Sequence, residues 1–172
     1  MIFFFMLQSL FYYDMMNQVI VMKYQKRRRM QHFDYSSVGA YFITICTLQR
    51  QNYFWTKDSF KETEDISYSD IGKAAAKAIE RIPVVYPSVQ LTEYVIMPNH
   101  IHLLLELTDN DNNITNIINQ TKGSIRKECN CLIFQKSFHD HIIRTEKEYR
   151  MIRQYIHDNP RKWKEDYYYL AE

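Results

Sequence analysis

The chain has 172 residues, of which 46% are hydrophobic, 3 are glycine and 4 are proline. A chain of this length forms one domain that buries roughly 70% of its unfolded surface, so it needs neither disulfides nor structural zinc to fold. Its three cysteines form no CxxC pair, which favours buried apolar side chains in a reducing cytoplasm over a disulfide framework. The net charge is only +2, so any signal for nucleic-acid binding must be local.

The first 21 residues form an apolar segment, Met1–Val21. This segment lacks the basic start and the small-residue cleavage site of a signal peptide. Asp14, Asn17 and Gln18 interrupt it before it reaches the ~20 apolar residues that a membrane span requires. We expect a dispensable extension or a misassigned start codon, with one domain over residues 22–172, and a helix on a membrane surface is the alternative. No export signal and no membrane partner are expected, and the predicted location is the cytoplasm.

The next part of the chain predicts the order strand, helix, strand, strand. Residues 40–48 (AYFITICTL) are rich in β-branched and aromatic side chains and predict a strand. Residues 67–82 (SYSDIGKAAAKAIERI) have apolar residues at helical spacing, and Ser69 or Asp70 can serve as the N-cap. Residues 90–107 (QLTEYVIMPNHIHLLLEL) predict two strands joined by a tight Pro-Asn turn.

The last part of the chain predicts a helix, a short strand and a final helix. The first of these helices is predicted over residues 114–132 by an apolar stripe from Ile114 to Cys129, and residues 140–144 (DHIIR) are the strand candidate. Thr145 and Glu148 form a capping box that begins the final helix, which must stop before Pro160. The resulting β-α-β-β-α-β-α order predicts an α+β fold, a split βαβ antiparallel sheet of the ferredoxin or RRM type with helices on one face.

Two histidines one residue apart suggest half of a metal site. On a strand, His100 and His102 project from the same face, while the apolar residues between and after them face the core. Two imidazoles on one face can converge on a divalent ion. Two solvated strand histidines are the alternative, and His139 and His141 have the same spacing. Spacing alone therefore does not identify the site.

The final helix offers candidates for the other half. Tyr155 and Asn159 are four residues apart, so they lie on one face of that helix about one turn apart. They would supply a phenol as nucleophile and an amide oxygen as ligand for a hard cation. Alternatively, Tyr155 extends the packing stripe of the helix and Asn159 only closes it.

Four separated blocks of the chain decide between these alternatives. They are HFDYSSVGAYFITICT, YVIMPNHIHLLLEL, QTKGSIRKE and FHDHIIRTEKEYRMIRQYIHDNPRKWKED, in this order. Together they resemble the REP-associated tyrosine transposases, which are single-tyrosine HUH enzymes related to small insertion-sequence transposases, over residues 24–166. The resemblance implies that His100 and His102 form the HUH motif, that Tyr155 on the C-terminal helix is the catalytic residue, and that Asn159 is the third metal ligand.

The resemblance also implies the chemistry: nicking and strand transfer of single-stranded or hairpin-forming DNA, for transposition or recombination. A tyrosine hydroxyl with its usual pKa near ~10 is a poor nucleophile at cellular pH. Mg²⁺ or Mn²⁺ held by His100, His102 and Asn159 would polarise the scissile phosphodiester. Tyr155 would then form a 5′-phosphotyrosine bond and release a 3′-hydroxyl. Such an exchange needs no ATP, and the chain has no GxxxxGK[ST] loop, so no nucleotide cofactor is expected.

Local basic residues would hold the DNA by neutralising phosphates. For each one, a solvated surface charge is the alternative, and a histidine that matches the family pattern could also be structural. Trp163 and Tyr167–Tyr169 could stack on unpaired bases or close the core. The candidate DNA contacts are Arg27, Arg28, Arg29, Lys122, Arg126, His141, Arg144, Arg161 and Lys162.

The sequence is also compatible with two other functions. One is a non-catalytic module, derived from a transposase, that binds single-stranded DNA or RNA, and the other is a metal-dependent hydrolase that uses water. The oligomeric state is also open, because the tyrosine helix could serve its own site in a monomer or the site of a partner in a homodimer.

Overall fold

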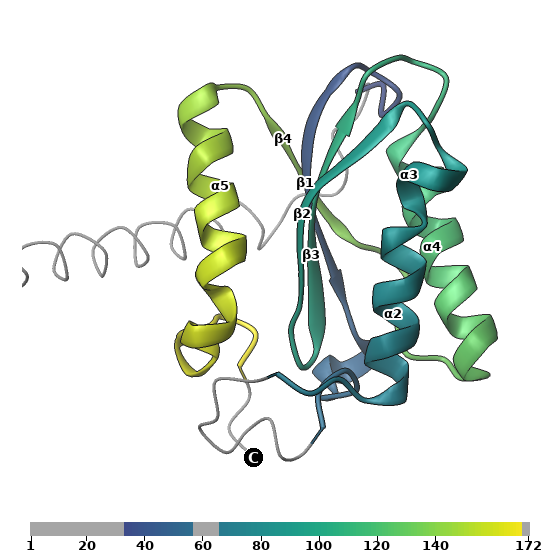
Figure 1. Ribbon diagram of the computed structural model, residues 1–172, viewed down its shortest axis with the longest axis vertical. Helices are drawn as coiled ribbons and strands as arrows, with labels where there is room; N and C mark the ends of the chain where they lie inside the picture. The colour runs from purple at the N-terminus through teal and green to yellow at the C-terminus, as the bar shows by residue number, and fades with distance from the viewer. Residues whose placement is uncertain (1–32, 57–65, 170–172) are drawn as a thin grey trace, which may run out of the picture.

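The chain folds around one antiparallel sheet with the strand order β2-β3-β1-β4 (Figure 1). The computed structural model describes residues 33–56 and 66–169, so the predicted extension Met1–Val21 lies outside the described residues. The predicted α+β split βαβ sheet is confirmed, because β1 and β3 are the central pair and every neighbouring pair is antiparallel. The strands are β1 (Gly39–Cys46), β2 (Val89–Ile96), β3 (His100–Leu107) and β4 (His139–Ile143).

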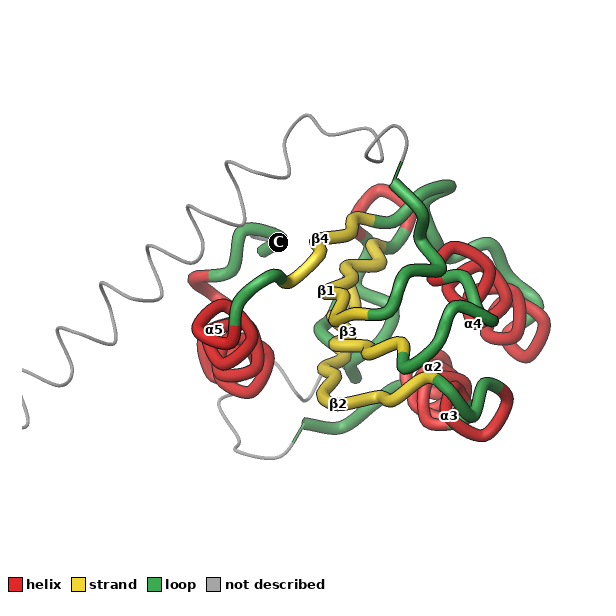
Figure 2. The backbone as a smooth tube through the Cα atoms, turned by 90° about the horizontal axis from the view of Figure 1, so that it is seen from above, coloured by secondary structure: helices red, strands yellow, loops and turns green. Residues whose placement is uncertain are grey.

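The helices cover the two faces of the sheet unequally. In Figure 2 the connecting helices α2, α3 and α4 lie on one face, and α5 lies alone on the other. None of the helices described between residues 33 and 169 is long and apolar enough to cross a bilayer. The helical elements are η1 (Leu48–Arg50), α2 (Asp70–Glu80), α3 (Ile82–Val85), α4 (Ile114–Cys129), α5 (Glu146–Asp158) and η3 (Asn159–Glu165).

The central strand β3 is buried on both faces. Ile101, Leu103 and Leu105 have no exposed surface, and strand alternation directs them toward α2 and α4. His100 and His102 alternate with these residues and so point to the opposite face, where His102 contacts Tyr155 of α5, and both histidines are fully buried. The alternative of two solvated histidines is therefore wrong, because α5 and the segment after it cover that face.

Two predicted helices end earlier than the sequence pattern suggests. The predicted helix over 67–82 stops at Glu80, and Pro83 occupies the first turn of the separate short helix α3. The predicted helix over 114–132 ends at Cys129, because Asn130 adopts the left-handed conformation, with φ 50°.

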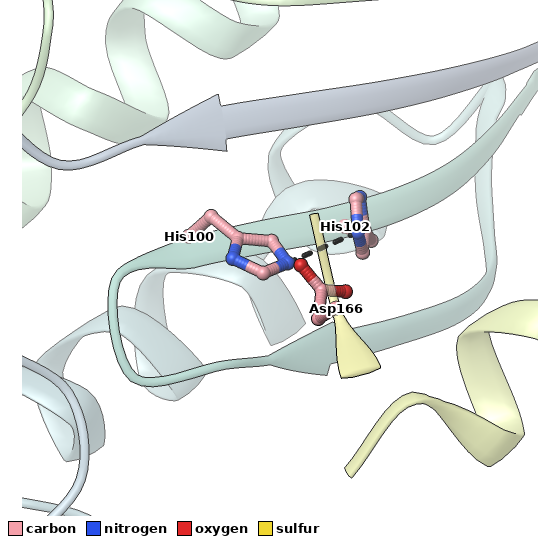
Figure 3. Close-up of side chains that lie close together, drawn as sticks. All are labelled: His100, His102 and Asp166. Atoms are coloured by element: carbon pink, nitrogen blue, oxygen red, sulfur yellow. Dashed lines mark hydrogen bonds between the residues drawn. The ribbon is translucent and has the colours of Figure 1, made fainter. Parts of the chain in front are cut away.

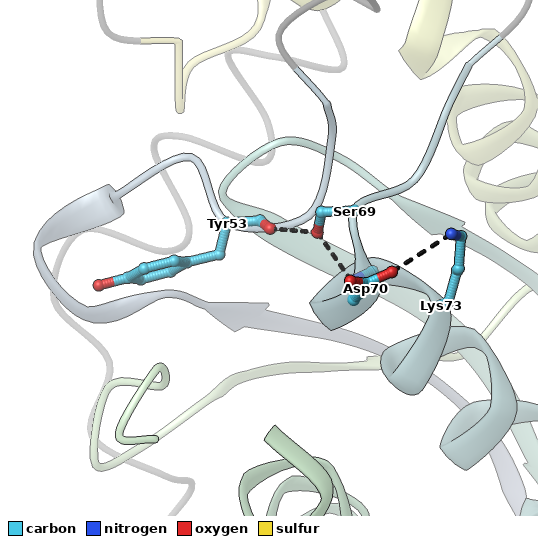
Figure 4. Close-up of polar contacts among 5 residues, drawn as sticks. Tyr53, Ser69, Asp70 and Lys73 are labelled. Atoms are coloured by element: carbon cyan, nitrogen blue, oxygen red, sulfur yellow. Dashed lines mark hydrogen bonds and ion pairs between the residues drawn. The ribbon is translucent and has the colours of Figure 1, made fainter. Parts of the chain in front are cut away.

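The first turn of α2 packs tightly against the loop that follows β1. The Ser69 hydroxyl donates to the carbonyl oxygen of Tyr53 (2.6 Å) and accepts from the amide of Gly72 (3.1 Å) (Figure 4). A Cβ atom at Gly72 would lie 2.2 Å from the carbonyl oxygen of Phe54. Only glycine fits this close approach, since the obstructing atom belongs to the backbone.

We expect Gly72→Ala to lower the free energy of unfolding by about 1–3 kcal/mol, because the added methyl group forces the helix away from the loop. The matched control is Gly123→Ala in α4, where nothing lies within 4 Å of the new Cβ. This second change should leave stability unchanged or raise it by up to about 1 kcal/mol. Urea denaturation followed by circular dichroism measures both, and equal effects would contradict the packing argument.

Candidate active site

The two histidines of β3 face each other across a short gap. Their Nε2 atoms lie 3.1 Å apart (Figure 3). The β1–β3 register pairs Thr44 with His102, and the Thr44 hydroxyl lies 2.9 Å from His102 Nδ1. Asn99, in the turn before β3, places its Oδ1 atom 2.9 Å from His100 Nδ1. Each ring is thus held at Nδ1, and both Nε2 atoms point into the same space.

The orientation of the Asn99 amide fixes the tautomer of His100. The Asn99 nitrogen donates to the carbonyl oxygens of Tyr168 (2.8 Å) and Arg50 (3.2 Å), so its oxygen must be the atom that faces His100. An amide oxygen only accepts hydrogen bonds, hence His100 carries its proton on Nδ1 and a lone pair on Nε2. When an ion is bound, the Thr44 hydroxyl can accept from His102 Nδ1 in the same way, which would leave a lone pair on His102 Nε2 for the ion.

Helix α5 brings the phenol of Tyr155 to this pair within the same chain. The Tyr155 hydroxyl lies 3.4 Å from Nε2 of His102, and its ring packs against the rings of His102 and Phe42. The side chain is 3% exposed. The helix is anchored at its start, where the Thr145 hydroxyl accepts from the amide of Glu148 (3.2 Å) as the capping pattern predicts.

A carboxylate that the sequence reasoning missed completes the cluster. Asp166 follows η3, and its oxygen lies within 4.8 Å of the ligand nitrogens of His100 and His102 (Figure 3). Its Oδ2 atom is 3.5 Å from the Tyr155 hydroxyl, and its Oδ1 atom accepts from the amide of Tyr168 (2.7 Å). Burial raises the pKa of Asp166 to about 6, against the opposing effect of these hydrogen bonds.

Asn159 is fully buried, and neither polar atom of its side chain has a hydrogen-bond partner in the described part of the chain. The amide lies close enough to Asp166 to help lower the pKa of that carboxyl group, although no hydrogen bond of good geometry joins them. An unsatisfied buried amide costs about 1–3 kcal/mol. This destabilisation is expected for a buried polar group whose partner is a bound ligand. Two imidazoles with amide and carboxylate oxygens fit a divalent cation such as Mn²⁺ or Mg²⁺, and would also accept zinc.

The electrostatics of the site keep both histidines neutral. Burial lowers the pKa of His102 to about 3, with a smaller contribution from the charge of His139. Burial also lowers the pKa of His100 well below 6.5, helped by the charges of His102 and Arg50. Neutral imidazole is the form that binds a metal, so these two rings are ready for coordination throughout the physiological pH range.

These pKa shifts predict that the metal-free protein loses stability in mild acid. From pH 7 to 5 the unfolded chain protonates His100 and His102 while the folded chain does not, so unfolding is favoured. Asp166 opposes this change, because its raised pKa lets the folded chain take up a proton near pH 6. These three groups together should contribute a loss of about 2–3 kcal/mol, from 1.36 kcal/mol per proton and pH unit.

Urea denaturation in EDTA at the two pH values measures this loss. The control variant is His157→Asn, in which an exposed histidine is replaced and the pH profile should not change. A protein that is as stable at pH 5 as at pH 7 would contradict the assignment of two buried neutral imidazoles.

The residues predicted to contact DNA differ in their exposure and in the face of the sheet on which they lie. Lys122 has a different role from the one predicted: it is 7% exposed, and its ammonium donates to the carbonyl oxygens of Gln135 (2.7 Å) and Lys136 (3.2 Å). Arg126 is exposed on α4, across the sheet from Tyr155. Of the remaining candidates, Arg144 and Arg161 are exposed, Lys162 is half-buried, and Arg27, Arg28 and Arg29 lie outside the described residues.

His141 lies on the α5 side of the sheet and is half-buried. Its Nε2 atom is 2.6 Å from a carboxylate oxygen of Glu148. The other oxygen of Glu148 accepts from the amide of Arg144 (3.0 Å). His141 therefore joins β4 to the first turn of α5, which is the structural role left open for it.

The aromatic tail closes the core beside the histidines. Trp163 and Tyr168 are buried, and their ring centroids lie 6.0 and 4.5 Å from that of His100. Tyr167 is exposed next to them. Of the two readings of this segment, the packing role thus applies to Trp163 and Tyr168.

Comparisons with known proteins agree with this architecture. The model of the family "Transposase IS200 like" matches residues 40–159. An uncharacterized protein of Haemophilus influenzae is 31% identical over 83% of this chain and 91% of its own length. A second H. influenzae protein, provisionally named a REP-associated tyrosine transposase, is 27% identical over 75% of this chain and 74% of its own.

A solved structure, described as a REP-associated tyrosine transposase bound to a REP hairpin, has the same fold. It aligns with a TM-score of 0.59 and 21% identity over 81% of this chain and 74% of that one. The family match spans more than half of the chain and contains the strands, α5 and both histidines. The chain belongs to the IS200-like transposase family.

Proposed function

We propose that this protein is a metal-dependent DNA nicking and strand-transfer enzyme, with Tyr155 as the nucleophile. The observation that carries the proposal is the position of the Tyr155 hydroxyl, 3.4 Å from Nε2 of His102 and within the same chain. The phenol therefore lies beside the two imidazoles without any contribution from a second subunit. This arrangement supports a monomer that acts with its own tyrosine.

The donor atoms support a divalent cation at this site. We assign His100 and His102 as nitrogen ligands, and Asp166 with Asn159 as the sources of oxygen ligands. Mn²⁺ or Mg²⁺ is the expected ion, since hard oxygen donors favour both. When bound, the ion supplies charge that polarises a phosphodiester and offsets the negative charge of the transition state.

Tyr155 would carry out the covalent step. Its oxygen attacks the phosphorus, forms a 5′-phosphotyrosine bond and breaks the bond from phosphorus to the 3′ oxygen, which leaves and takes a proton as a 3′-hydroxyl. The Asp166 carboxylate, 3.5 Å from the phenol, is the candidate acceptor of the phenolic proton. Attack by a 3′-hydroxyl on phosphotyrosine reverses these bond changes and joins strands without ATP.

The substrate we propose is single-stranded or hairpin DNA. The structural relative is described as bound to a REP hairpin, and the same fold here places α5 alone on one face of the sheet. Arg144, Arg161 and Lys162 flank α5 at its two ends, where each could neutralise a backbone phosphate. A binding module without catalysis is the second candidate, and the experiment below separates the two.

Trapping of the covalent intermediate tests the proposal. The protein is incubated with Mn²⁺ and a pool of labelled hairpin oligonucleotides with randomised single-stranded flanks, and the products are separated on a denaturing gel. A labelled band that migrates with the protein supports the proposal. Binding without cleavage supports the non-catalytic module, and cleavage that leaves no adduct and persists in Tyr155→Phe supports a hydrolase that uses water.

A further inference from the structure

The turn that follows β1 holds two residues in a strained backbone conformation. Gln49 and Arg50 have φ angles of 52° and 55°, in the left-handed region that non-glycine residues rarely occupy. Strain of this kind costs about 1–3 kcal/mol per residue and persists only where the surroundings enforce it. Strained residues cluster at functional sites.

Buried hydrogen bonds enforce the conformation. Thr47 is fully buried, and its hydroxyl lies 2.8 Å from the carbonyl oxygen of Gln51 and 2.9 Å from that of Asn99. The side-chain amide nitrogen of Asn99 also donates to the carbonyl oxygen of Arg50 (3.2 Å). The same Asn99 side chain accepts from His100. The strained turn is therefore tied directly to the histidine pair.

The turn presents the Arg50 side chain at the edge of the site. Its guanidinium carbon lies 5.1 and 5.0 Å from the ring centroids of Tyr167 and Tyr168, and the Tyr168 ring lies 4.5 Å from that of His100. Stacking on aromatic rings orients a guanidinium group through its face. The N–H donors, which lie in the plane of the guanidinium, can still form hydrogen bonds. Among the described residues, no carboxylate forms an ion pair with Arg50.

Arg50 brings a positive charge to the edge of the site, because its guanidinium stacks on Tyr168, whose ring lies against His100. A fixed positive charge beside a reacting phosphate stabilises the negative charge that develops in the transition state. The planar guanidinium of arginine can also donate two parallel hydrogen bonds to two oxygens of one phosphate, and the ammonium of lysine cannot do this.

We infer that Arg50 binds a non-bridging oxygen of the phosphodiester that Tyr155 attacks, and that the strained turn anchored by Asn99 holds it for this purpose. The inference rests on the proposed function and adds to it a residue that contacts the reacting group. The sequence blocks that point to the tyrosine and the histidines give no indication of this role.

Single-turnover formation of the Tyr155 adduct in Mn²⁺ tests the inference, with wild type, Arg50→Gln and Arg50→Lys. We expect the rate to fall about a hundredfold in Arg50→Gln and roughly tenfold in Arg50→Lys, which keeps the charge but loses the fork. The affinity for Mn²⁺, measured by calorimetry without DNA, should not fall by more than about twofold in either variant, because loss of a positive charge does not weaken the binding of a cation. The matched control is Arg81→Gln, an exposed arginine after α2 on the other face of the sheet, which should react at the wild-type rate.

A second measurement distinguishes contact with phosphate from an effect on folding. Replacing one non-bridging oxygen of the scissile phosphate by sulfur should slow the wild type for one stereoisomer more than for the other, and Arg50→Gln should reduce that difference. An Arg50→Gln rate within about threefold of wild type, or an unchanged stereoisomer difference, would overturn the inference. Absence of any adduct in the wild type would instead overturn the proposed function, so the two failures are distinguishable.

Discussion

Tyr155→Phe should abolish the covalent protein–DNA adduct, with a fall in rate of roughly a thousandfold or more, because the change removes the only attacking atom. The loss should not come from unfolding. The phenylalanine ring keeps the packing against Phe42 and His102, and the contacts that the hydroxyl makes with His102 (3.4 Å) and Asp166 (3.5 Å) are long. We therefore expect the free energy of unfolding to change by less than about 1 kcal/mol. Adduct yield on a denaturing gel and urea denaturation measure the two quantities.

The matched control for this experiment lies on the same helix. Tyr149 also belongs to α5, but its hydroxyl donates to Glu106 instead of facing the histidines. Tyr149→Phe removes a phenol of the same kind and should keep adduct formation within about twofold of wild type. Equal losses in the two variants would show that α5 needs its hydroxyls for packing, and would argue against Tyr155 as nucleophile.

Local sequence patterns were sufficient to predict the elements that carry the site. The strand His100–Leu107 has the predicted bounds, and α5 begins after the predicted cap Thr145. Both predictions depend on periodicity and capping, which are properties of neighbouring residues. The meeting of Tyr155 with His102 across 53 residues follows from the fold, and the family resemblance supplied that step.

Other parts of the site depend on long-range placement. Asp166 follows the end of α5 in a stretch without periodicity, so nothing local directs its carboxylate toward the histidines. Glu165 beside it is also a carboxylate, so the sequence offers no signal that separates the two. Thr44 meets His102 only through the β1–β3 register. Lys122 is buried because a loop after α4 passes over it, which helical spacing cannot reveal.

Replacing both histidines, in His100→Ala/His102→Ala, should weaken Mn²⁺ binding by roughly a hundredfold or more. Loss of a mere supporting residue already costs about 10–100-fold in other metal sites, and here two direct ligands disappear. Calorimetry or the electron paramagnetic resonance signal of free Mn²⁺ measures the affinity without DNA. The exposed histidine His157 provides the control, since His157→Ala should bind Mn²⁺ as the wild type does. Unchanged affinity in the double variant would eliminate the proposed site.

Asn159 allows a sharper test, because its two expected effects have opposite signs. In the metal-free protein its amide is fully buried without a hydrogen-bond partner in the described structure, so it destabilises the fold. Asn159→Leu, which keeps the branched shape of the side chain, should raise the free energy of unfolding in EDTA by about 1 kcal/mol and at the same time weaken Mn²⁺ binding. If Asn159 only closes α5, the same change should leave the Mn²⁺ affinity untouched. A residue that costs stability without the ion and adds affinity with it is one whose partner is the ion.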